Sequence, residues 1–478
     1  MSAQKKQLDW GSVLGYGVGA IGLDLSYGLF NSFLMNYFTD VLLINSVFIG
    51  GVAAVARIWD GINDPMMGTI VDNTRSKQGK FRPWILLGTV LNALVLVALF
   101  ANPGFEVNAA SPSKALWLYA SACYVLWGMT YTITDIPYWS MVPTFTNDPK
   151  ERNIVAAIPR LFSGAGQLLI VVLTVKMVKL LGDGTESSQQ GFTRWAAVCG
   201  AIMVLASCVT VFATRKMPRV YPNAPKEKIT LGKAFAVIKS NDQLLAFMVT
   251  AILFNTGWYL TNGLGIYYFK WVVGDADKMS LFGMVVGAGQ AIGLVLLPIL
   301  SRSFGRGMVV KGAMAVSFAA YIAMFLVGQV NFYLFLACGA VGCAGIGAMF
   351  VAQTAMLADV VDYGEYKTGK RTDSVVFSMK SLLLKAAYAI QSLIIGAGLK
   401  LAHYDGSLEA QPQSATTGIS IMMFAIPPAF VLLSFLVFRT KYKLDGAKME
   451  ELRASLAQRA AAADMAENEQ ELEQRQGN

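Results

Sequence analysis

The sequence predicts an all-α membrane protein with twelve transmembrane helices in two six-helix halves. Of the 478 residues, 55% are hydrophobic and only 14% are charged, whereas soluble domains carry about 25% charged residues. Long apolar runs recur along the chain, and a polar segment near the middle divides them into two equal sets. A soluble globule of this length has too little interior for so many apolar residues, which argues against a large soluble enzyme.

Each predicted helix is an apolar run of about 20 residues or more, the length needed to cross a hydrocarbon layer of roughly 30 Å. Transmembrane barrel strands are shorter and alternate in polarity, so helices are expected. The twelve runs are 12–38, 46–71, 83–101, 115–141, 154–181, 194–214, 245–273, 280–300, 309–328, 331–358, 375–401 and 417–438.

The polar segment 215–244 is predicted to be a cytoplasmic middle loop that joins two domains. Residues 1–214 form the N-terminal six-helix half, and residues 245–443 form the C-terminal six-helix half. Residues 444–478 are rich in Ala, Glu and Gln, which is typical of a solvated cytoplasmic tail. Two six-helix halves are the layout of major facilitator transporters.

The loops predict that both chain ends lie in the cytoplasm, because cytoplasmic loops carry an excess of Lys and Arg. One side holds Lys5, Lys6, Arg75, Lys77, Lys80, Arg82, Lys150, Arg152, the seven basic residues of 215–244, Arg302, Arg306, Lys311, Lys367, Lys370 and Arg371. The other side holds little beyond Lys114, Arg194 and Lys278. The excess of basic residues in the predicted cytoplasmic loops therefore explains the net charge of +9. We expect a bacterial inner (plasma) membrane protein and no nucleic-acid partner.

Cysteine and histidine residues indicate no enzymatic chemistry. The five cysteines lie in apolar runs without metal-ligand spacing. His403 is the only histidine, which excludes an HExxH zinc site. No GxSxG motif is present that would supply a serine nucleophile. We therefore expect neither an enzyme nor a cofactor.

Aspartates at membrane depth mark the predicted functional site. Asp60 and Asp64 lie four residues apart in the second run, so they share one helix face. Asp135 lies in the fourth run, one turn after Thr132, and Asp24 lies in the middle of the first. Each buried aspartate costs roughly 2.5–3.5 kcal/mol on insertion scales. Such residues require a partner or a water-filled cavity.

Carboxylates and a hydroxyl are hard oxygen ligands, which suit a hard cation better than a soft transition metal. Asp60, Asp64 and Asp135 cannot all stay ionised close together without a counter-charge. A bound Na⁺, Li⁺ or proton would supply that charge. The alternative is that the chain's own basic residues, such as Arg57, pair with these carboxylates.

Basic and aromatic residues in the same runs suggest a site for a polyhydroxylated ligand. Arg160 and Lys385 could each neutralise an aspartate or bind a ligand hydroxyl. Asp24 and Arg160 form an attractive pair, because a carboxylate accepts and a guanidinium donates hydrogen bonds. Trp139 and Tyr131 could contact the apolar face of a pyranose ring. Ordinary helix packing is the alternative for both aromatic residues.

Four segments resemble the glycoside–pentoside–hexuronide:cation symporters, and most of all their melibiose-permease branch. These segments are ARIWDGINDP at 56–65, GKFRPW at 79–84, YTITDIPYW at 131–139 and DVVDYGE at 359–365. The matches extend along the chain to about residue 443 and are specific when taken together.

This resemblance implies a major facilitator transporter that imports a sugar together with Na⁺, Li⁺ or H⁺. The implied cation ligands are Asp60, Asp64, Thr132 and Asp135. The implied sugar-site residues are Asp24, Arg160, Trp139 and Lys385. Import would proceed by alternating access between the two halves.

Two other functions remain open from the sequence, namely a sodium-dependent lysolipid carrier of the same fold and a non-transporting membrane sugar sensor. The expected partners are a small sugar or glycoside, a monovalent cation and the lipid bilayer. A monomer is expected. The coupling ion is a substrate rather than a resident cofactor.

Overall fold

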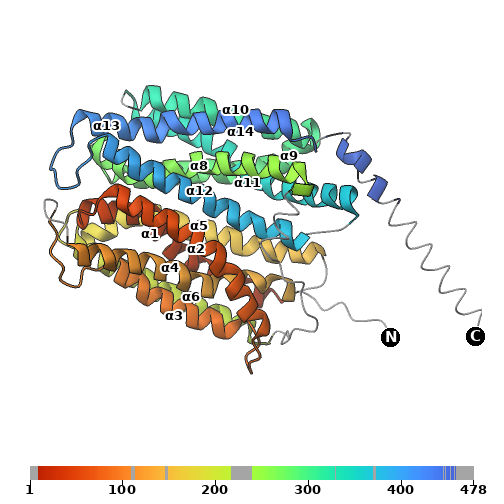
Figure 1. The fold of residues 1–478 in the computed structure, drawn as a ribbon, viewed down its shortest axis with the longest axis horizontal. Helices are drawn as coiled ribbons and strands as arrows, with labels where there is room; N and C mark the ends of the chain where they lie inside the picture. Colours follow the sequence, from red (N-terminus) through yellow and green to blue (C-terminus); the bar gives the residue numbers. More distant parts are fainter. Residues whose placement is uncertain are drawn as a thin grey trace, which may run out of the picture. The chain divides into compact units, whose positions relative to one another are not determined.

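The computed structural model of the protein describes residues 9–108, 113–145, 149–216, 239–328, 330–369, 373–444, 446, 448–452, 454–456 and 458. Within these residues all regular elements are helices (Figure 1). The predicted all-α class is therefore confirmed. Residues 217–238 of the predicted middle loop and most of the predicted tail lie outside the described residues.

Six long helices precede the middle segment. They are α1 (Trp10–Asn36), α2 (Ser46–Asn73), α3 (Arg82–Leu99), α4 (Lys114–Ser140), α5 (Pro149–Leu181) and α6 (Gln189–Ala213). A π-helical turn, η1 (Tyr37–Val41), continues α1, and short 3₁₀ turns, η2 (Val142–Thr144) and η3 (Thr214–Lys216), follow α4 and α6.

The helices after the middle segment have a similar length. They are α8 (Asp242–Trp271), α9 (Lys278–Phe304), α10 (Arg306–Val327), α11 (Phe332–Thr368), α12 (Asp373–Leu401), and the run of α13 (Gln413–Ser420), η4 (Ile421–Ala425, π-helical) and α14 (Ile426–Lys441). Each of the twelve predicted runs coincides with one of these helices or helical runs.

Ten helices of the described residues are long and apolar enough to cross a membrane. Helices α2 and α4 are not among the ten, although they have 28 and 27 residues. Both carry predicted site residues, and polar residues lower the apolar content of a helix. The chain is a multi-pass membrane protein, while the number of twelve spans stays a prediction.

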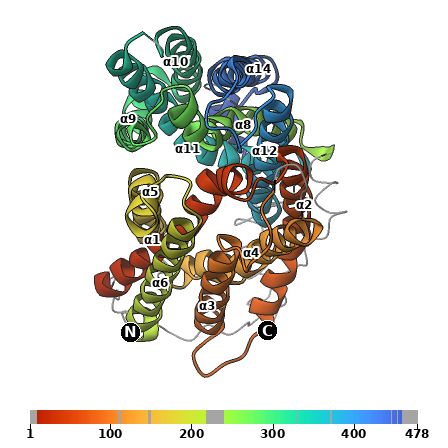
Figure 2. The ribbon, with the colours of Figure 1, turned by 90° about the vertical axis from the view of Figure 1, so that its left-hand side faces the viewer.

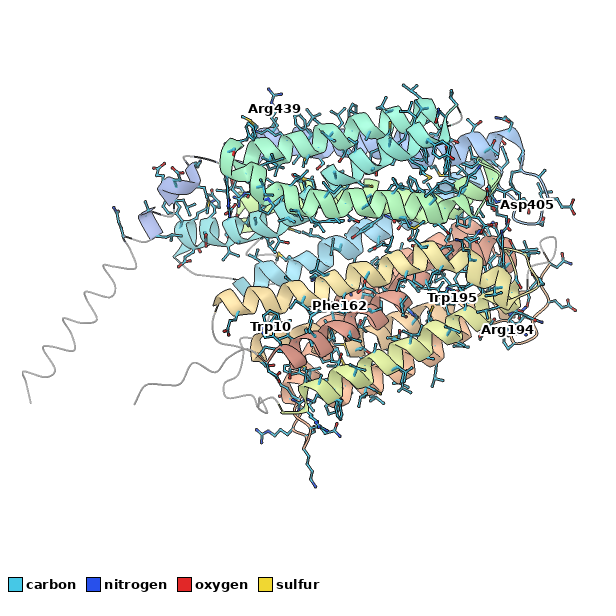
Figure 3. All side chains as sticks on the ribbon, turned by 180° about the vertical axis from the view of Figure 1, so that it is seen from behind. Trp10, Phe162, Arg194, Trp195, Asp405 and Arg439 are labelled. Atoms are coloured by element: carbon cyan, nitrogen blue, oxygen red, sulfur yellow. The ribbon has the colours of Figure 1, made fainter. Side chains whose placement is uncertain are left out.

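Side-chain caps fix where several helices begin, because the first backbone N–H groups of a helix have no partner within it. Asp9 accepts from the backbone N–H of Gly11 at the start of α1. Ser188 does the same for Gly191 at the start of α6. Figure 3 shows Trp10 at one end of the helices and Arg194 and Asp405 at the other.

The described residues fall into two compact units. The first contains those of 1–226, 258–285 and 385–426, and the second contains those of 227–257, 286–384 and 427–478. In the first unit, α1 packs against α5 and α6, α3 packs against α4 and α6, and α2 packs against α4 (Figure 2). In the second unit, α10 packs against α11.

Polar contacts tie α1, α3 and α4 together inside the first unit. The Ser26 hydroxyl donates to Asn92 Oδ1 at 2.9 Å, and Asn92 Nδ2 donates to Thr130 Oγ1 at 3.0 Å. Tyr16 and Tyr138 each donate a hydroxyl to the other's backbone carbonyl, and their rings stack at 4.3 Å. Interhelical hydrogen bonds of this kind stabilise helix association where apolar surface gives no driving force. They hold α1 and α4, which carry predicted site residues, in a fixed register.

In the second unit, α9 and α11 approach closely through small residues. A Cβ atom added to Gly293 would lie 1.8 Å from the backbone oxygen of Ala344, and one added to Gly289 would lie 2.1 Å from that of Ala340. Small residues allow helix backbones to come this near in membranes. Gly293 is therefore required by the packing of α9.

Replacing Gly293 with valine is expected to destabilise the protein, because the new side chain would push α9 away from the α11 backbone. Overpacking of this kind costs about 1–3 kcal/mol. Gly312 on α10 is the matched control, since nothing lies within 4 Å of its added Cβ. The thermal midpoint of the detergent-purified protein should fall for Gly293→Val and stay near wild type for Gly312→Val. Equal midpoints would contradict the close packing of α9 and α11.

Candidate functional site

The two carboxylates of α2 are each paired with a basic residue of the chain. Asp60 Oδ2 lies 3.1 Å from Arg57 Nη1, one turn earlier on the same helix. Asp64 pairs with Lys385 of α12, whose Nζ also lies 3.8 Å from Asp60 Oδ2. Thr132 of α4 donates its hydroxyl to Asp64 Oδ1 at 3.0 Å. Three helices therefore meet at Asp64.

The Arg57 guanidinium is held by aromatic rings as well as by Asp60. Its Cζ atom lies 5.4 Å from the centroid of Phe30 on α1 and 5.5 Å from that of Tyr388 on α12. The Arg57 side chain is only 7% exposed. Cation–π contacts are strongest where water is excluded. Arg57 is thus fixed in place, whereas Lys385, at 18% exposed, is held by the carboxylates.

Asp135 and Arg160 both contact the indole ring of Trp139, Asp135 at its N–H group and Arg160 over its face. The Trp139 Nε1–H donates to Asp135 Oδ1 at 3.0 Å, one turn along α4. The Arg160 guanidinium of α5 lies 4.1 Å from the Trp139 ring centroid. Trp139 therefore joins a residue of the predicted cation site to a residue of the predicted sugar site.

Asp24 on α1 is held by α5. Its Oδ2 accepts a hydrogen bond from the Ser163 hydroxyl. Arg160, which was predicted to bind a ligand together with Asp24, places its guanidinium over the Trp139 ring. Asp24 and Arg160 nevertheless lie on helices that pack against each other.

Tyr131 belongs to an aromatic stack rather than standing alone. Its ring stacks on Tyr27 of α1 at 5.3 Å and on Trp127 of α4 at 5.1 Å. Trp127 is fully buried and Tyr131 is half-buried. Helix packing accounts for these two ring contacts, and the role of Tyr131 in ligand contact stays a prediction.

Burial separates the site residues into two groups. Asp60 and Thr132 are both 4% exposed, whereas Asp24, Asp64, Asp135, Trp139 and Lys385 are partly exposed and Arg160 is exposed. Gly128 of α4 makes room for the buried carboxylate, because a Cβ atom there would lie 3.0 Å from Asp60 Oδ1. Asp64 and Asp135 are therefore less buried than Asp60.

The predicted site residues contact their partners in separate pairs, and they are not arranged as one set of ligands around a single ion. In the part of the chain that the structure describes, no group of three or more His, Cys, Asp or Glu side chains is arranged to hold a metal ion. The pairing of the α2 carboxylates with basic residues is the alternative that the sequence left open. A coupling cation would have to replace one of these basic partners.

Three residues of the site were not predicted from the sequence, namely Ser163, Tyr388 and Phe30. Ser163 and Tyr388 lie three residues after a predicted site residue on the same helix, namely Arg160 and Lys385. Residues three apart share a helix face, so this spacing would have been a usable signal. Phe30, six residues after Asp24, gave no such signal.

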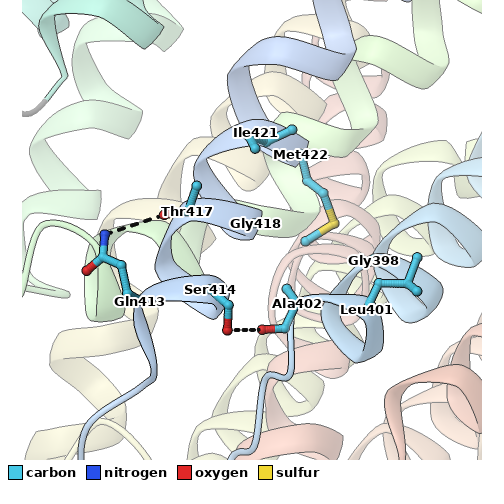
Figure 4. Close-up of a pocket in the computed structure, with 9 residues that line it drawn as sticks. All are labelled: Gly398, Leu401, Ala402, Gln413, Ser414, Thr417, Gly418, Ile421 and Met422. Carbon is cyan, nitrogen blue, oxygen red and sulfur yellow. Dashed lines mark hydrogen bonds between the residues drawn. The ribbon is translucent and has the colours of Figure 1, made fainter.

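An open recess lies elsewhere in the first unit, where α12 ends and α13 begins (Figure 4). Its volume is about 440 Å³, and Gly398, Ala402, Ser414 and Met422 contribute to its lining. The Ser414 hydroxyl donates to the Ala402 carbonyl across it at 3.0 Å. It contains none of the predicted site residues, so the candidate site is the carboxylate cluster.

The sequence matches a family model described as MFS/sugar transport protein over residues 15–446. Similar proteins include the inner membrane symporter YicJ of Escherichia coli, which is 30% identical over 93% of this chain and 94% of its own length. The putative glycoside/cation symporter YagG of the same organism is 27% identical over 95% of this chain and 96% of its own length. The lactose permease of Lactobacillus helveticus is 27% identical over 92% of this chain and 71% of its own length.

Solved structures agree on the fold. A D-xylose–proton symporter has a TM-score of 0.63 at 14% identity and covers 91% of this chain and 98% of its own. A bacterial homologue of the lysosomal transporter Spinster has a TM-score of 0.67 at 14% identity and covers 91% of this chain and 98% of its own. These similarities confirm the predicted major facilitator fold.

Proposed function

This chain belongs to the MFS/sugar transport protein family, and from this membership we propose that it is a symporter that couples import of a glycoside to Na⁺, Li⁺ or H⁺. Relatives described as glycoside/cation symporter and lactose permease support sugar cargo. The proposal includes the bacterial inner membrane, two six-helix halves and cytoplasmic termini. The single observation that carries it is the pairing of Asp64 with Lys385, a flexible basic side chain that a cation could displace.

The charge balance of the site supports coupling to one monovalent cation. In the described residues, four carboxylates and three basic side chains make up the site. They are Asp24, Asp60, Asp64 and Asp135, and Arg57, Arg160 and Lys385. When all are ionised, one negative charge remains uncompensated. One Na⁺, Li⁺ or proton would neutralise it, so we expect one coupling ion per sugar.

The coupling ion would compete with Lys385 for Asp64. Arg57 is clamped between aromatic rings and stays with Asp60. Among the described residues no ring contact of this kind holds Lys385, and its long flexible stem allows the ammonium to move away. Asp64, Thr132 and Asp135 would then supply oxygen ligands of the kind that hard cations prefer, with Asp60 beside them. Ion binding would thereby break one of the contacts between α12 and α2.

The sugar would bind beside this site. Asp24 accepts and Arg160 donates hydrogen bonds, which suits adjacent hydroxyl groups. Trp139 offers an aromatic face once the Arg160 guanidinium moves to the ligand. Trp139 also donates a hydrogen bond to Asp135. Neutralisation of Asp135 by the ion would therefore change the hydrogen bond that orients the Trp139 ring, and the sugar contacts this ring. Linkage then requires sugar and ion to tighten each other's binding by the same factor.

Uptake into proteoliposomes tests this function. A panel of labelled glycosides is offered at fixed pH with an inward Na⁺ gradient, an inward Li⁺ gradient, a pH gradient or none. We expect accumulation of at least one glycoside above its external concentration under one of these gradients. Binding of a sugar without any uptake would favour a sensor, and neither binding nor uptake of any sugar would favour the lysolipid carrier.

A further inference from the structure

A second charged cluster lies away from the sugar and cation site, at the end of the first unit that carries Asp405 and Arg194 (Figure 3). It is centred on Asp40, whose side chain is fully buried. Lys270 Nζ donates to Asp40 Oδ2 at 3.0 Å, and the Tyr404 hydroxyl donates to Asp40 Oδ1 at 2.6 Å. We call Asp40, Lys270 and Tyr404 the polar latch.

The latch joins segments that are far apart in the sequence. Asp40 belongs to η1 after α1, Lys270 to the last turn of α8, and Tyr404 to the connection between α12 and α13. Thr39 extends the network, because its hydroxyl lies 2.8 Å from Asp40 Oδ1 and 2.7 Å from the Tyr267 hydroxyl of α8. The latch therefore connects the chain before the middle loop to two segments after it.

Two further contacts hold the donors in place. Lys270 Nζ also donates to the Ser187 hydroxyl at 2.8 Å, in the connection between α5 and α6. The Trp271 Nε1–H donates to the Tyr404 oxygen at 2.9 Å. Burial raises the pKa of the Tyr404 phenol, and the Asp40 charge raises it further. Tyr404 thus stays protonated and keeps its role as a donor.

The backbone beside the latch is unusual. In the described residues, the non-glycine residues with positive φ are Leu43, at 51°, and His403, at 59°. Leu43 follows η1, and His403 precedes Tyr404. The π-helical turn that carries Asp40 is itself a rare element that often marks functional positions. Such conformations persist where the surroundings hold them, and they are found at switch regions.

We propose that the polar latch holds this end of the transporter shut, and that its separation opens this end during transport. The inference rests on the proposed transport function. A buried ion pair stabilises a closed end less than apolar packing of the same volume would. When the end opens, water solvates Asp40 and Lys270 and replaces their contacts. A charged latch can thus open and close repeatedly, which an apolar seal would resist.

Labelling of a buried cysteine tests the latch. Thr39 is 5% exposed, so a Thr39→Cys thiol is protected while the end is closed. In the full-length protein purified in detergent, adding Lys270→Met is expected to raise the rate of its reaction with a charged maleimide at least about tenfold. Lys278→Met is the matched control, because its ion pair with Asp275 at the same end is exposed to 42% and 43%. The control should label at the rate of Thr39→Cys alone.

Equal labelling rates with and without Lys270→Met, in protein that elutes as a single species, would overturn the proposal. Should the Lys270 variant misfold, Tyr404→Phe removes one latch hydrogen bond with little change in volume and should raise the rate in the same direction. The readout needs no sugar and no ion gradient. A failure of the proposed symport would therefore appear in the uptake assay without changing the labelling result.

Discussion

Replacing Asp24 with alanine is expected to abolish sugar binding while cation binding persists. A hydrogen bond to a charged acceptor contributes about 1.5–3 kcal/mol, and a carboxylate accepts at least two from a polyol, so affinity should fall at least about a hundredfold. Asp24 is partly exposed and lies on α1, against α5. Calorimetric titration of the purified variant with the transported glycoside measures the loss.

Ser163→Ala is the graded control for this prediction. It leaves the Asp24 carboxylate in place but removes the hydroxyl that orients it. One hydrogen bond of this kind corresponds to a smaller loss of sugar affinity, about tenfold. An Asp24→Ala affinity within about twofold of wild type, where truncating a bonded group normally costs far more, would show that the sugar binds elsewhere.

Replacing Asp64 with asparagine is expected to uncouple sugar movement from the ion gradient. The substitution removes the negative charge for which the cation and Lys385 compete. The remaining carboxylates and basic residues of the site then balance, so no ion is needed for neutrality. Gradient-driven accumulation should vanish, while exchange of internal for external sugar continues. The same proteoliposomes measure both processes.

The comparison between Asp64 and Asp60 sharpens this prediction. Asp60→Asn should also weaken ion stimulation more than it weakens sugar binding without the ion. Its effect should be smaller than that of Asp64→Asn, because Asp60 is buried and already neutralised by the clamped Arg57. Full accumulation by Asp64→Asn under an ion gradient would exclude Asp64 from the coupling site.

Hydropathy predicted the helices well but not all of their ends. The tenth run was predicted to end at residue 358, yet α11 continues to Thr368. The extension is polar on one side, and Asp359 pairs there with Arg306 while Lys367 pairs with Asp242. An apolar run ends where the charges begin, whereas a helix continues as long as its polar residues have partners. Such tertiary partners are invisible to a scan for apolar residues.

In the candidate site too, the arrangement of residues within one helix could be predicted from the sequence, whereas contacts between distant helices could not. Helical spacing placed Asp60 and Asp64 on one face of α2, where both lie near Lys385, and the family resemblance grouped them with Thr132, which donates to Asp64. It could not tell that Lys385, more than 300 positions later, would pair with Asp64. Nor could it tell that the Arg160 guanidinium would lie over the Trp139 ring. Contacts between distant helices depend on packing that no single segment encodes.

The most direct test of ion–sugar coupling is the sugar affinity of the purified wild-type protein with and without the coupling ion. Calorimetric titrations at one pH would compare Na⁺, Li⁺ and a choline control, and a pH series in choline would test protons. We predict that one of these ions tightens sugar binding by about fivefold or more, within the range usual for coupled sites. A sugar affinity that none of these ions changes would contradict coupling through the Asp64–Lys385 pair.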